Sequence, residues 1–96
     1  MKAYLIVDLS IHDPQGFEPY IASIPAVIAG HGGKFIVSAA APTPVEGDWS
    51  PERMVIVEFP ARQNAEQFLK DPKFQELARI RRRTTISKLV LVDGAD

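Results

Sequence analysis

Four short apolar stretches of the chain have the length and composition of β-strands, which favour β-branched and aromatic side chains. They cover residues 3–9, 34–40, 54–59 and 89–92. The segments after the first and third stretches have apolar residues at helical spacing instead. The order strand, helix, strand, strand, helix, strand predicts a ferredoxin-like α+β fold, with a four-stranded antiparallel sheet and helices on one face.

The first helix should begin at Asp13 and Pro14, because aspartate caps helices well and proline fits the first helical position. Pro19 and Pro25 lie inside the helical pattern, and each removes a backbone hydrogen bond, so we expect a kinked or two-part helix. One apolar face runs along this segment over about four turns. It consists of Phe17, Tyr20, Ile21, Ile24, Val27 and Ile28.

The glycines at 30, 32 and 33 should end this helix, because glycine adopts a left-handed backbone at low cost. The stretch leads from a helix into a strand, whereas phosphate-binding loops lead from a strand into a helix N-terminus. This direction excludes a phosphate cradle and leaves His31 as the residue of chemical interest. Its imidazole is either a general base or ligand donor, or a helix-end histidine bonded to a backbone carbonyl.

A second helical segment follows the third strand, with one pattern over residues 61–69 and a restart at Asp71 and Pro72. The restarted helix should again have aspartate as its cap and proline at its first position. One face of this helix carries Phe74, Leu77, Ala78 and Arg81.

Arg81 therefore lies on the buried side of the last helix, where a guanidinium needs an anionic partner. Two interpretations remain open. Asp8, Glu46 or Glu58 provides a structural carboxylate, or a bound ligand provides one.

The apolar stretches do not alternate cleanly between apolar and polar residues, as in "YLIV", "MVIV" and "LVLV". Such continuous runs are typical of strands that are covered on both faces. The helices cover only one face, so we expect a second copy of the chain on the other, in a face-to-face homodimer with a two-fold axis. The alternative is a monomer that leaves a short apolar sheet face exposed.

Length and charge narrow the functional classes. The 96 residues correspond to one domain, 1–96. A net charge of −1 argues against nucleic acid as a partner and removes any general attraction to an anionic membrane. The apolar N-terminus is short and interrupted by Asp8, and no run approaches the length of a membrane span. The chain has no cysteine, which excludes disulfides and thiolate chemistry. We expect a cytoplasmic protein.

Four motifs together resemble the bacterial domain-of-unknown-function 1330 family: "AVIAGHGGKFIV", "EGDW.PERMVIVEFP", "DPKFQELA.IR" and "LVLVDG". The resemblance covers nearly the whole chain. It implies a dimeric α+β barrel and no particular reaction. The wider superfamily includes cofactor-free monooxygenases, haem-degrading enzymes and lactone isomerases. Assigning any of these activities to this chain would rest on the fold alone.

Position by position, the resemblance gives a set of family residues in this sequence. They are Tyr20, His31, Gly32, Gly33, Glu46, Gly47, Trp49, Glu58, Phe59, Pro60 and Arg81. The chain departs from the family at residues 38–41, where relatives often have Arg and Gly. Phe74 replaces a usual tyrosine, and Phe68 lies near the position of a common tryptophan.

These residues suggest a candidate site. His31 and Glu58 would form an acid/base pair if they lie close together, and Glu58 on a strand should be paired or shifted in pKa. Arg81 would bind an anion, and the loop residue Trp49 would cover a pocket or an interface, or seal the edge of the core. Tyr20 and Glu46 join the ligand-binding set through the resemblance.

We expect no cofactor and no metal, because His12 and His31 are far apart and no segment has the spacing of a metal motif. Three functions remain. The first is a cofactor-independent enzyme, monooxygenase- or isomerase-like, that acts on a small organic acid or aromatic compound. The second is a module that binds a small ligand without catalysis, and the third is a purely structural dimer.

Overall fold

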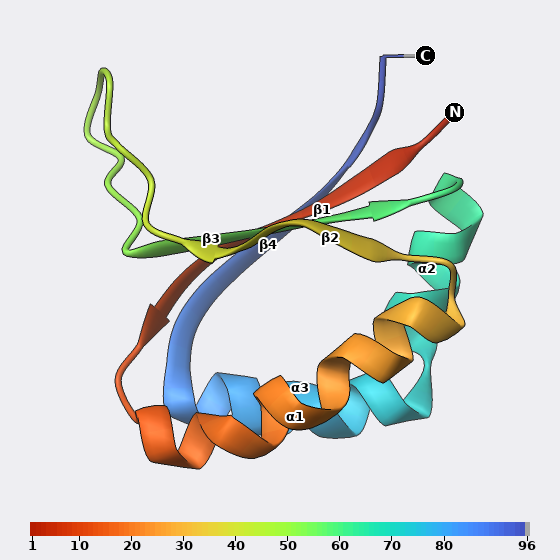
Figure 1. The fold of residues 1–96 in the computed structure, drawn as a ribbon, viewed down its shortest axis with the longest axis horizontal. Coiled ribbons are helices and arrows are strands. Elements are labelled where there is room, and N and C mark those ends of the chain that lie inside the picture. Colours follow the sequence, from red (N-terminus) through yellow and green to blue (C-terminus); the bar gives the residue numbers. More distant parts are fainter. Residues whose placement is uncertain (96) are drawn as a thin grey trace.

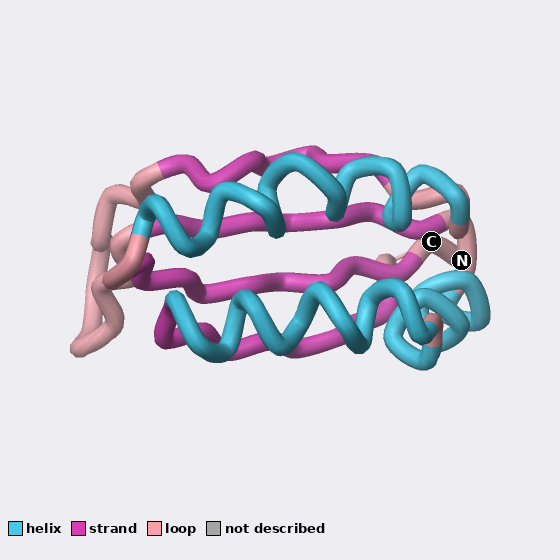
Figure 2. The backbone as a smooth tube through the Cα atoms, turned by 90° about the horizontal axis from the view of Figure 1, so that it is seen from below, coloured by secondary structure: helices cyan, strands magenta, loops and turns pink. Residues whose placement is uncertain are grey.

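The computed structural model describes residues 1–95. Its four strands form one antiparallel sheet in the order β2-β3-β1-β4, and the helices all lie on one face of it (Figures 1 and 2). This is the predicted ferredoxin-like α+β architecture. The elements are β1 (Ala3–Ile11), α1 (Pro14–Gly30), β2 (Lys34–Ala40), β3 (Arg53–Phe59), α2 (Arg62–Lys70), α3 (Pro72–Thr84) and β4 (Thr85–Asp93).

The sheet has two chemically different faces. β1 lies inside it and pairs with β3 on one side and with β4 on the other, with Leu5 opposite both Val57 and Leu91. Because side chains alternate along a strand, these residues share the face that packs against the helices. Tyr4 and Ile6 of β1 lie on the opposite face, which no helix covers (Figure 1).

Helix α1 is continuous from Pro14 to Gly30, although Pro19 and Pro25 lie inside it. Of the two expected alternatives, a kinked helix and a helix in two parts, the second was therefore wrong. Each proline removes one hydrogen bond, but the buried face of Phe17, Ile24 and Ile28 anchors the helix on both sides of these gaps.

Strand β4 differs from the sequence expectation, whereas the junction between α2 and α3 follows it. Strand β4 begins at Thr85, four residues before the predicted Leu89, because its pairing with β1 continues to the pair Ile11 and Thr85. The predicted restart at Asp71 is confirmed. This residue ends α2 and begins α3, and its side chain accepts a hydrogen bond from the backbone N–H of Lys73 at 2.9 Å.

The glycines after α1 have distinct roles. Gly32 has a φ of +78°, in the left-handed region, and its N–H donates to the carbonyl of Ala29. Gly33 lies so close to the core that an added Cβ would be 2.7 Å from Ile28 Cγ2 and 2.8 Å from Phe59 Cε1. The stretch is thus a turn in which one glycine supplies the conformation and another allows close packing.

A matched pair of substitutions tests this assignment. Gly33→Ala should lower the free energy of unfolding by about 1–3 kcal/mol, because the added methyl overpacks the core. Gly30→Ala places its methyl in open space, and it should raise that free energy by up to about 1 kcal/mol through helix propensity. Urea unfolding measures both. Equal effects of the two substitutions would contradict the close packing at Gly33.

Candidate functional site: a buried arginine in an apolar cavity

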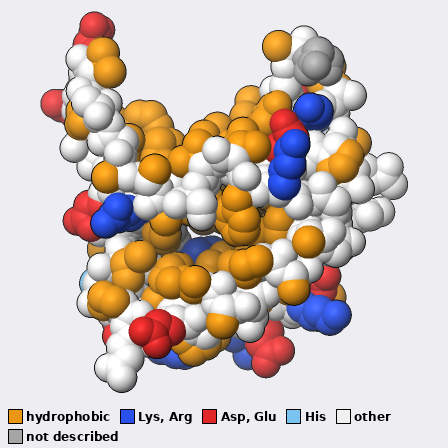
Figure 3. Space-filling model, in the orientation of Figure 1, with side chains coloured by type: hydrophobic (Ala, Val, Ile, Leu, Met, Phe, Trp, Pro, Cys, Tyr) orange, Lys and Arg blue, Asp and Glu red, His pale blue; other side chains and the backbone are white. Residues whose placement is uncertain are grey.

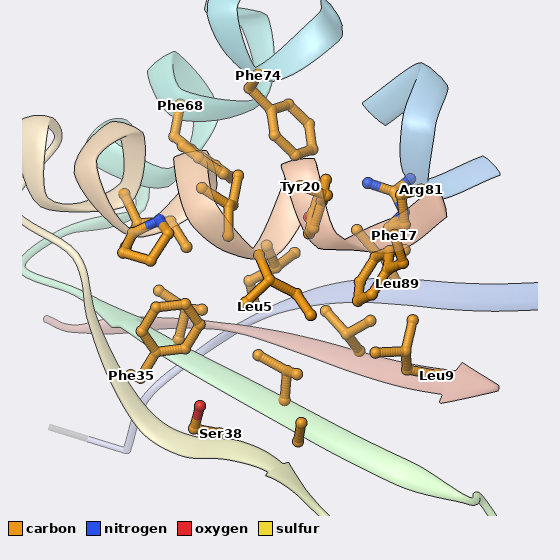
Figure 4. A pocket seen from close by; sticks show the side chains of 18 of the residues that line it. Leu5, Leu9, Phe17, Tyr20, Phe35, Ser38, Phe68, Phe74, Arg81 and Leu89 are labelled. Carbon is orange, nitrogen blue, oxygen red and sulfur yellow. The ribbon is translucent and has the colours of Figure 1, made fainter. Parts of the chain in front are cut away.

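A cavity of about 340 Å³ lies between the helices and the sheet. Its walls are formed by apolar side chains from the helices and all four strands, including Leu5, Phe17, Phe35 and Phe74 (Figure 4). This volume lies near the lower end of the range for small-molecule pockets, about 300–1,000 Å³. The cavity can therefore hold a small, largely apolar molecule.

The opening of the cavity lies between α1 and the edge strand β2. Among the residues that line the cavity, Ile21 of α1 is 54% exposed, and Pro25 of α1 and Ser38 of β2 are also exposed. Figure 3 shows the hollow below the sheet, with orange walls and a blue basic group inside. Arg81 is the basic residue among those that line the cavity.

Irregularities in β2 shape this opening. Phe35 pairs with Val57 and Ser38 with Val55, and the register shifts between them. The shift places Phe35 and Ser38 on the same face although they are three residues apart. Ala39 follows with a φ of +56°, a left-handed conformation that is strained for a residue other than glycine. The strand edge that borders the cavity is thus locally strained.

Arg81 lies at the inner end of the cavity and is only 6% exposed. Its Nε donates to the hydroxyl of Ser87 at 3.1 Å, and its guanidinium carbon lies 5.8 Å from the centre of the Phe74 ring. Its Nη1 has no hydrogen-bond partner within residues 1–95. Figure 4 shows the guanidinium beside the apolar side chains of the cavity wall. The sequence correctly placed Arg81 on the buried face of α3, but no internal carboxylate of the described chain pairs with it.

Tyr20 is the second polar group at this end. Its ring stacks on Phe17 with the centroids 5.0 Å apart. Burial raises the pKa of the Tyr20 hydroxyl, and a hydrogen bond and the positive charge of Arg81 partly oppose this. The phenol therefore stays protonated in the neutral pH range, next to the guanidinium.

His31 lies outside the cavity lining, at the end of α1. Its Nε2 is 2.8 Å from Asp71 Oδ2, and its ring meets Phe68 edge-on at 5.9 Å. The hydrogen bond from His31, helped by the backbone N–H of Lys73, holds the pKa of Asp71 below its usual range. The pair joins the end of α1 to the junction of α2 and α3.

Glu58 lies on the uncovered face of the sheet, because its neighbours Val57 and Phe59 point into the core. Its carboxylate is 3.3 Å from Lys34 Nζ and accepts a hydrogen bond from the Tyr4 hydroxyl at 3.2 Å. Desolvation acts to raise its pKa, but Lys34, Lys2 and Tyr4 outweigh it, so the pKa is lowered. The sheet thus separates Glu58 from His31, and the structure does not bring the two together as an acid/base pair.

Trp49 and Glu46 belong to the loop between β2 and β3, which rises on the side of the sheet away from the helices (Figure 1). Trp49 is 59% exposed, and its indole N–H donates to Asp8 Oδ2 at 2.9 Å. Glu46 is exposed. Neither residue lines the cavity, so of the four expected ligand-binding residues only Tyr20 and Arg81 meet there.

The Ser87 hydroxyl is a neighbour of Arg81 that the sequence pattern did not indicate. The last strand was predicted to begin at Leu89, so Ser87 lay outside it. In the structure β4 begins at Thr85, and this brings the Ser87 hydroxyl to the guanidinium of Arg81. A serine two residues before an apolar run gives no signal of such a role. The position of Ser87 depends on the pairing of β4 with β1, which the local sequence pattern does not reveal.

The uncovered face of the sheet carries exposed apolar side chains besides the charged Asp8 and Glu58. Ile86, Val90 and Val92 of β4 are 68%, 59% and 45% exposed. Figure 3 shows orange atoms along this upper side, between two projecting arms, one of which is the loop between β2 and β3. Within residues 1–95, no helix is long and apolar enough to cross a bilayer, and no three potential metal-ligating side chains come together.

The fold and the cavity define a ferredoxin-like α+β protein with a small pocket between its helices and its sheet. The chain belongs to the family described as Domain of unknown function (DUF1330), whose model matches residues 2–95. The resemblance stated from the sequence is thereby confirmed. No curated protein sequence matches the chain.

Solved structures share the fold. A protein of unknown function from Rhodopseudomonas palustris has a TM-score of 0.77 at 16% identity, covering 99% of this chain and 83% of that one. SnoaB, a cofactor-independent oxygenase from Streptomyces nogalater, has a TM-score of 0.69 at 20% identity, covering 99% and 94%. A dimeric protein of unknown function and ferredoxin-like fold from Bacteroides fragilis has a TM-score of 0.55 at 13% identity, covering 97% and 96%. Identities this low show the fold alone.

The lowered pKa of Asp71 predicts a pH dependence of stability. A carboxyl with a depressed pKa in the folded state stabilises the fold above its unfolded pKa, and this contribution is lost as pH falls through the folded pKa. Wild type should therefore exceed Asp71→Asn in unfolding free energy near neutral pH, and the difference should shrink in acid. Urea unfolding from pH 7 down to pH 3 measures it.

Asp13→Asn is the control for helix capping, because Asp13 caps α1 by accepting from the N–H of Gly16 and has no histidine partner within the described chain. A difference between wild type and Asp71→Asn that stays constant across this pH range would contradict the role of the His31–Asp71 pair.

Proposed function

We propose that this protein binds a small organic acid, or an acidic aromatic compound, in the cavity between its helices and its sheet. The observation that carries the proposal concerns Arg81, which is among the residues that line the apolar cavity: its Nη1 is buried and has no hydrogen-bond partner within residues 1–95. Buried guanidinium groups normally have anionic partners, because an isolated buried charge is costly. A ligand anion would supply the missing partner.

The surroundings of Arg81 support a functional role over a structural one. A structural arginine would be saturated by a carboxylate of its own chain, whereas the side chain of Arg81 has a hydrogen bond to Ser87 and no ion pair within residues 1–95. The cavity beside it is open to solvent between α1 and β2. The expected acid/base roles of His31 and Glu58 are not part of this proposal, because neither side chain lines the cavity.

Cofactor-independent oxygenation is a second candidate. An enolate or phenolate is also an anion, and a buried guanidinium that binds it would stabilise the electron-rich form of a substrate that reacts directly with dioxygen. The similarity of fold to SnoaB is compatible with this chemistry but does not establish it. Oxygen consumption with an electron-rich phenol would support this candidate, and binding without turnover would favour the first.

We further propose that a second copy of the chain covers the apolar sheet face. The exposed Ile86, Val90 and Val92 form part of a surface that is unusual on a soluble monomer. A two-fold axis through this surface would pair identical apolar patches. The similar Bacteroides fragilis protein is dimeric, which is in line with this arrangement.

Arg81→Met tests the binding proposal. Methionine keeps much of the length of the side chain but removes the charge, so it should leave the free energy of unfolding unchanged or raise it by about 1 kcal/mol. Benzoate should raise the melting temperature of the wild-type protein, and the same substitution should abolish this stabilisation. Arg82→Met, at an exposed position of α3, should change neither property. Loss of more than about 2 kcal/mol in Arg81→Met would assign Arg81 a structural role instead.

A pair of adjacent residues tests the dimer. Ile56→Asp places a charge on the uncovered face of β3, so the protein should remain folded but become monomeric. Val57→Asp places the same charge in the core, where Val57 is 1% exposed, and should unfold the protein. Light scattering and circular dichroism at micromolar concentration distinguish these outcomes. A stable dimer of Ile56→Asp would contradict the face-to-face arrangement.

A further inference from the structure

We propose that the ligand is a monocarboxylate with an otherwise uncharged, apolar body, which enters head first so that Arg81 and Tyr20 each donate a hydrogen bond to its carboxylate. This inference rests on the proposed binding function and specifies the class of ligand. It follows from the hydrogen-bonding character, the charge and the position of the groups at the inner end of the cavity.

The two groups at this end both act as donors. Nη1 of Arg81 carries N–H groups without a partner in the described chain, and a guanidinium has no acceptor. Tyr20 also lines the cavity, and its side chain lies beside Arg81 (Figure 4). Its hydroxyl is protonated in the neutral pH range and can therefore donate a hydrogen bond to a ligand in the cavity. A carboxylate, which only accepts hydrogen bonds, matches two such donors.

The charge of the cavity limits the ligand to one negative group. Arg81 is the basic residue among the cavity-lining residues of the described chain, and no Asp or Glu is among them. The ammonium of an amino acid would therefore be buried without a carboxylate partner, and a second ligand carboxylate would be buried without a cation. Either unpaired charge would strongly disfavour binding.

The position of Arg81 sets the orientation. The opening lies at Ile21, Pro25 and Ser38, between α1 and β2. Arg81 comes from α3 and is bonded to Ser87 of β4, the strand at the opposite edge of the sheet from β2. The carboxylate must therefore pass through the apolar cavity to reach Arg81. The body of the ligand then lies behind it, among rings such as Phe35 and Phe68 (Figure 4).

Four compounds that share a benzyl group test this class of ligand. They are 3-phenylpropionate, 3-phenylpropionamide, phenylalanine and benzylmalonate, which differ in the loss of the charge, the gain of an ammonium or the gain of a second carboxylate. Isothermal titration calorimetry of the wild-type protein should show binding of 3-phenylpropionate. The other three should bind about 10- to 100-fold more weakly, the range expected when a charged hydrogen bond is lost or a charge is left unpaired.

The outcomes separate this inference from the proposed function. If the amide or phenylalanine binds as tightly as 3-phenylpropionate, the cavity binds small molecules but the monocarboxylate class is wrong. If benzylmalonate binds more tightly, the limit of one negative group is wrong. If none of the four binds and wild type and Arg81→Met behave alike, both the inference and the proposed function fail.

The two tyrosines of the chain provide a matched test of the second donor. Tyr20→Phe should weaken binding of 3-phenylpropionate about 10-fold, the range expected for loss of a hydrogen bond to a charged group, while circular dichroism shows an unchanged fold. Tyr4→Phe removes the other hydroxyl, which lies on the uncovered sheet face and donates to Glu58, and it should leave the affinity unchanged. Equal affinities of wild type and Tyr20→Phe would remove Tyr20 from the proposed site.

Discussion

The site depends on one physical constraint: the buried guanidinium of Arg81 has no ionic partner within the described chain. Its guanidinium is desolvated by aromatic and aliphatic side chains, yet its Nη1 has no partner in the described chain. Such an arrangement weakens the free protein, because a buried charge is stabilised only by an opposite charge or by several hydrogen bonds. The arrangement becomes favourable when an anion enters the cavity. Binding and stability are thereby opposed at a single side chain, as is common at functional sites.

The fold creates the space for that anion by leaving α1 loosely packed against the edge strand β2. The register shift in β2 turns Ser38 toward the cavity, and Ala39 follows in a strained conformation. The other polar clusters lie elsewhere. The His31–Asp71 pair joins helix ends, whereas Glu58 and Trp49 have their partners on the uncovered face of the sheet. One face of the sheet therefore forms the cavity, and the other offers an apolar surface for assembly.

The sequence predicted those features that depend on local pattern. The strands follow from β-branched runs, the break at Asp71 from a cap followed by proline, and the burial of Arg81 from its place on an apolar helix face. It did not predict partners distant in the chain. His31 meets Asp71 across 40 residues, and the partner of Trp49 is Asp8. These contacts depend on how the helices and loops lie on the sheet, and the shift in β2 has no glycine or proline to indicate it.

The central claim is that the cavity holds an apolar carboxylate whose head group binds Arg81. A crystal structure of the protein with 3-(4-bromophenyl)propionate tests it most directly, because the anomalous signal of bromine locates the tail independently of the carboxylate. The account predicts carboxylate density within hydrogen-bond distance of Arg81 Nη1 and the Tyr20 hydroxyl, with bromine toward the opening between α1 and β2. Bromine at the inner end beside Arg81, or a ligand bound outside an empty cavity, would contradict it.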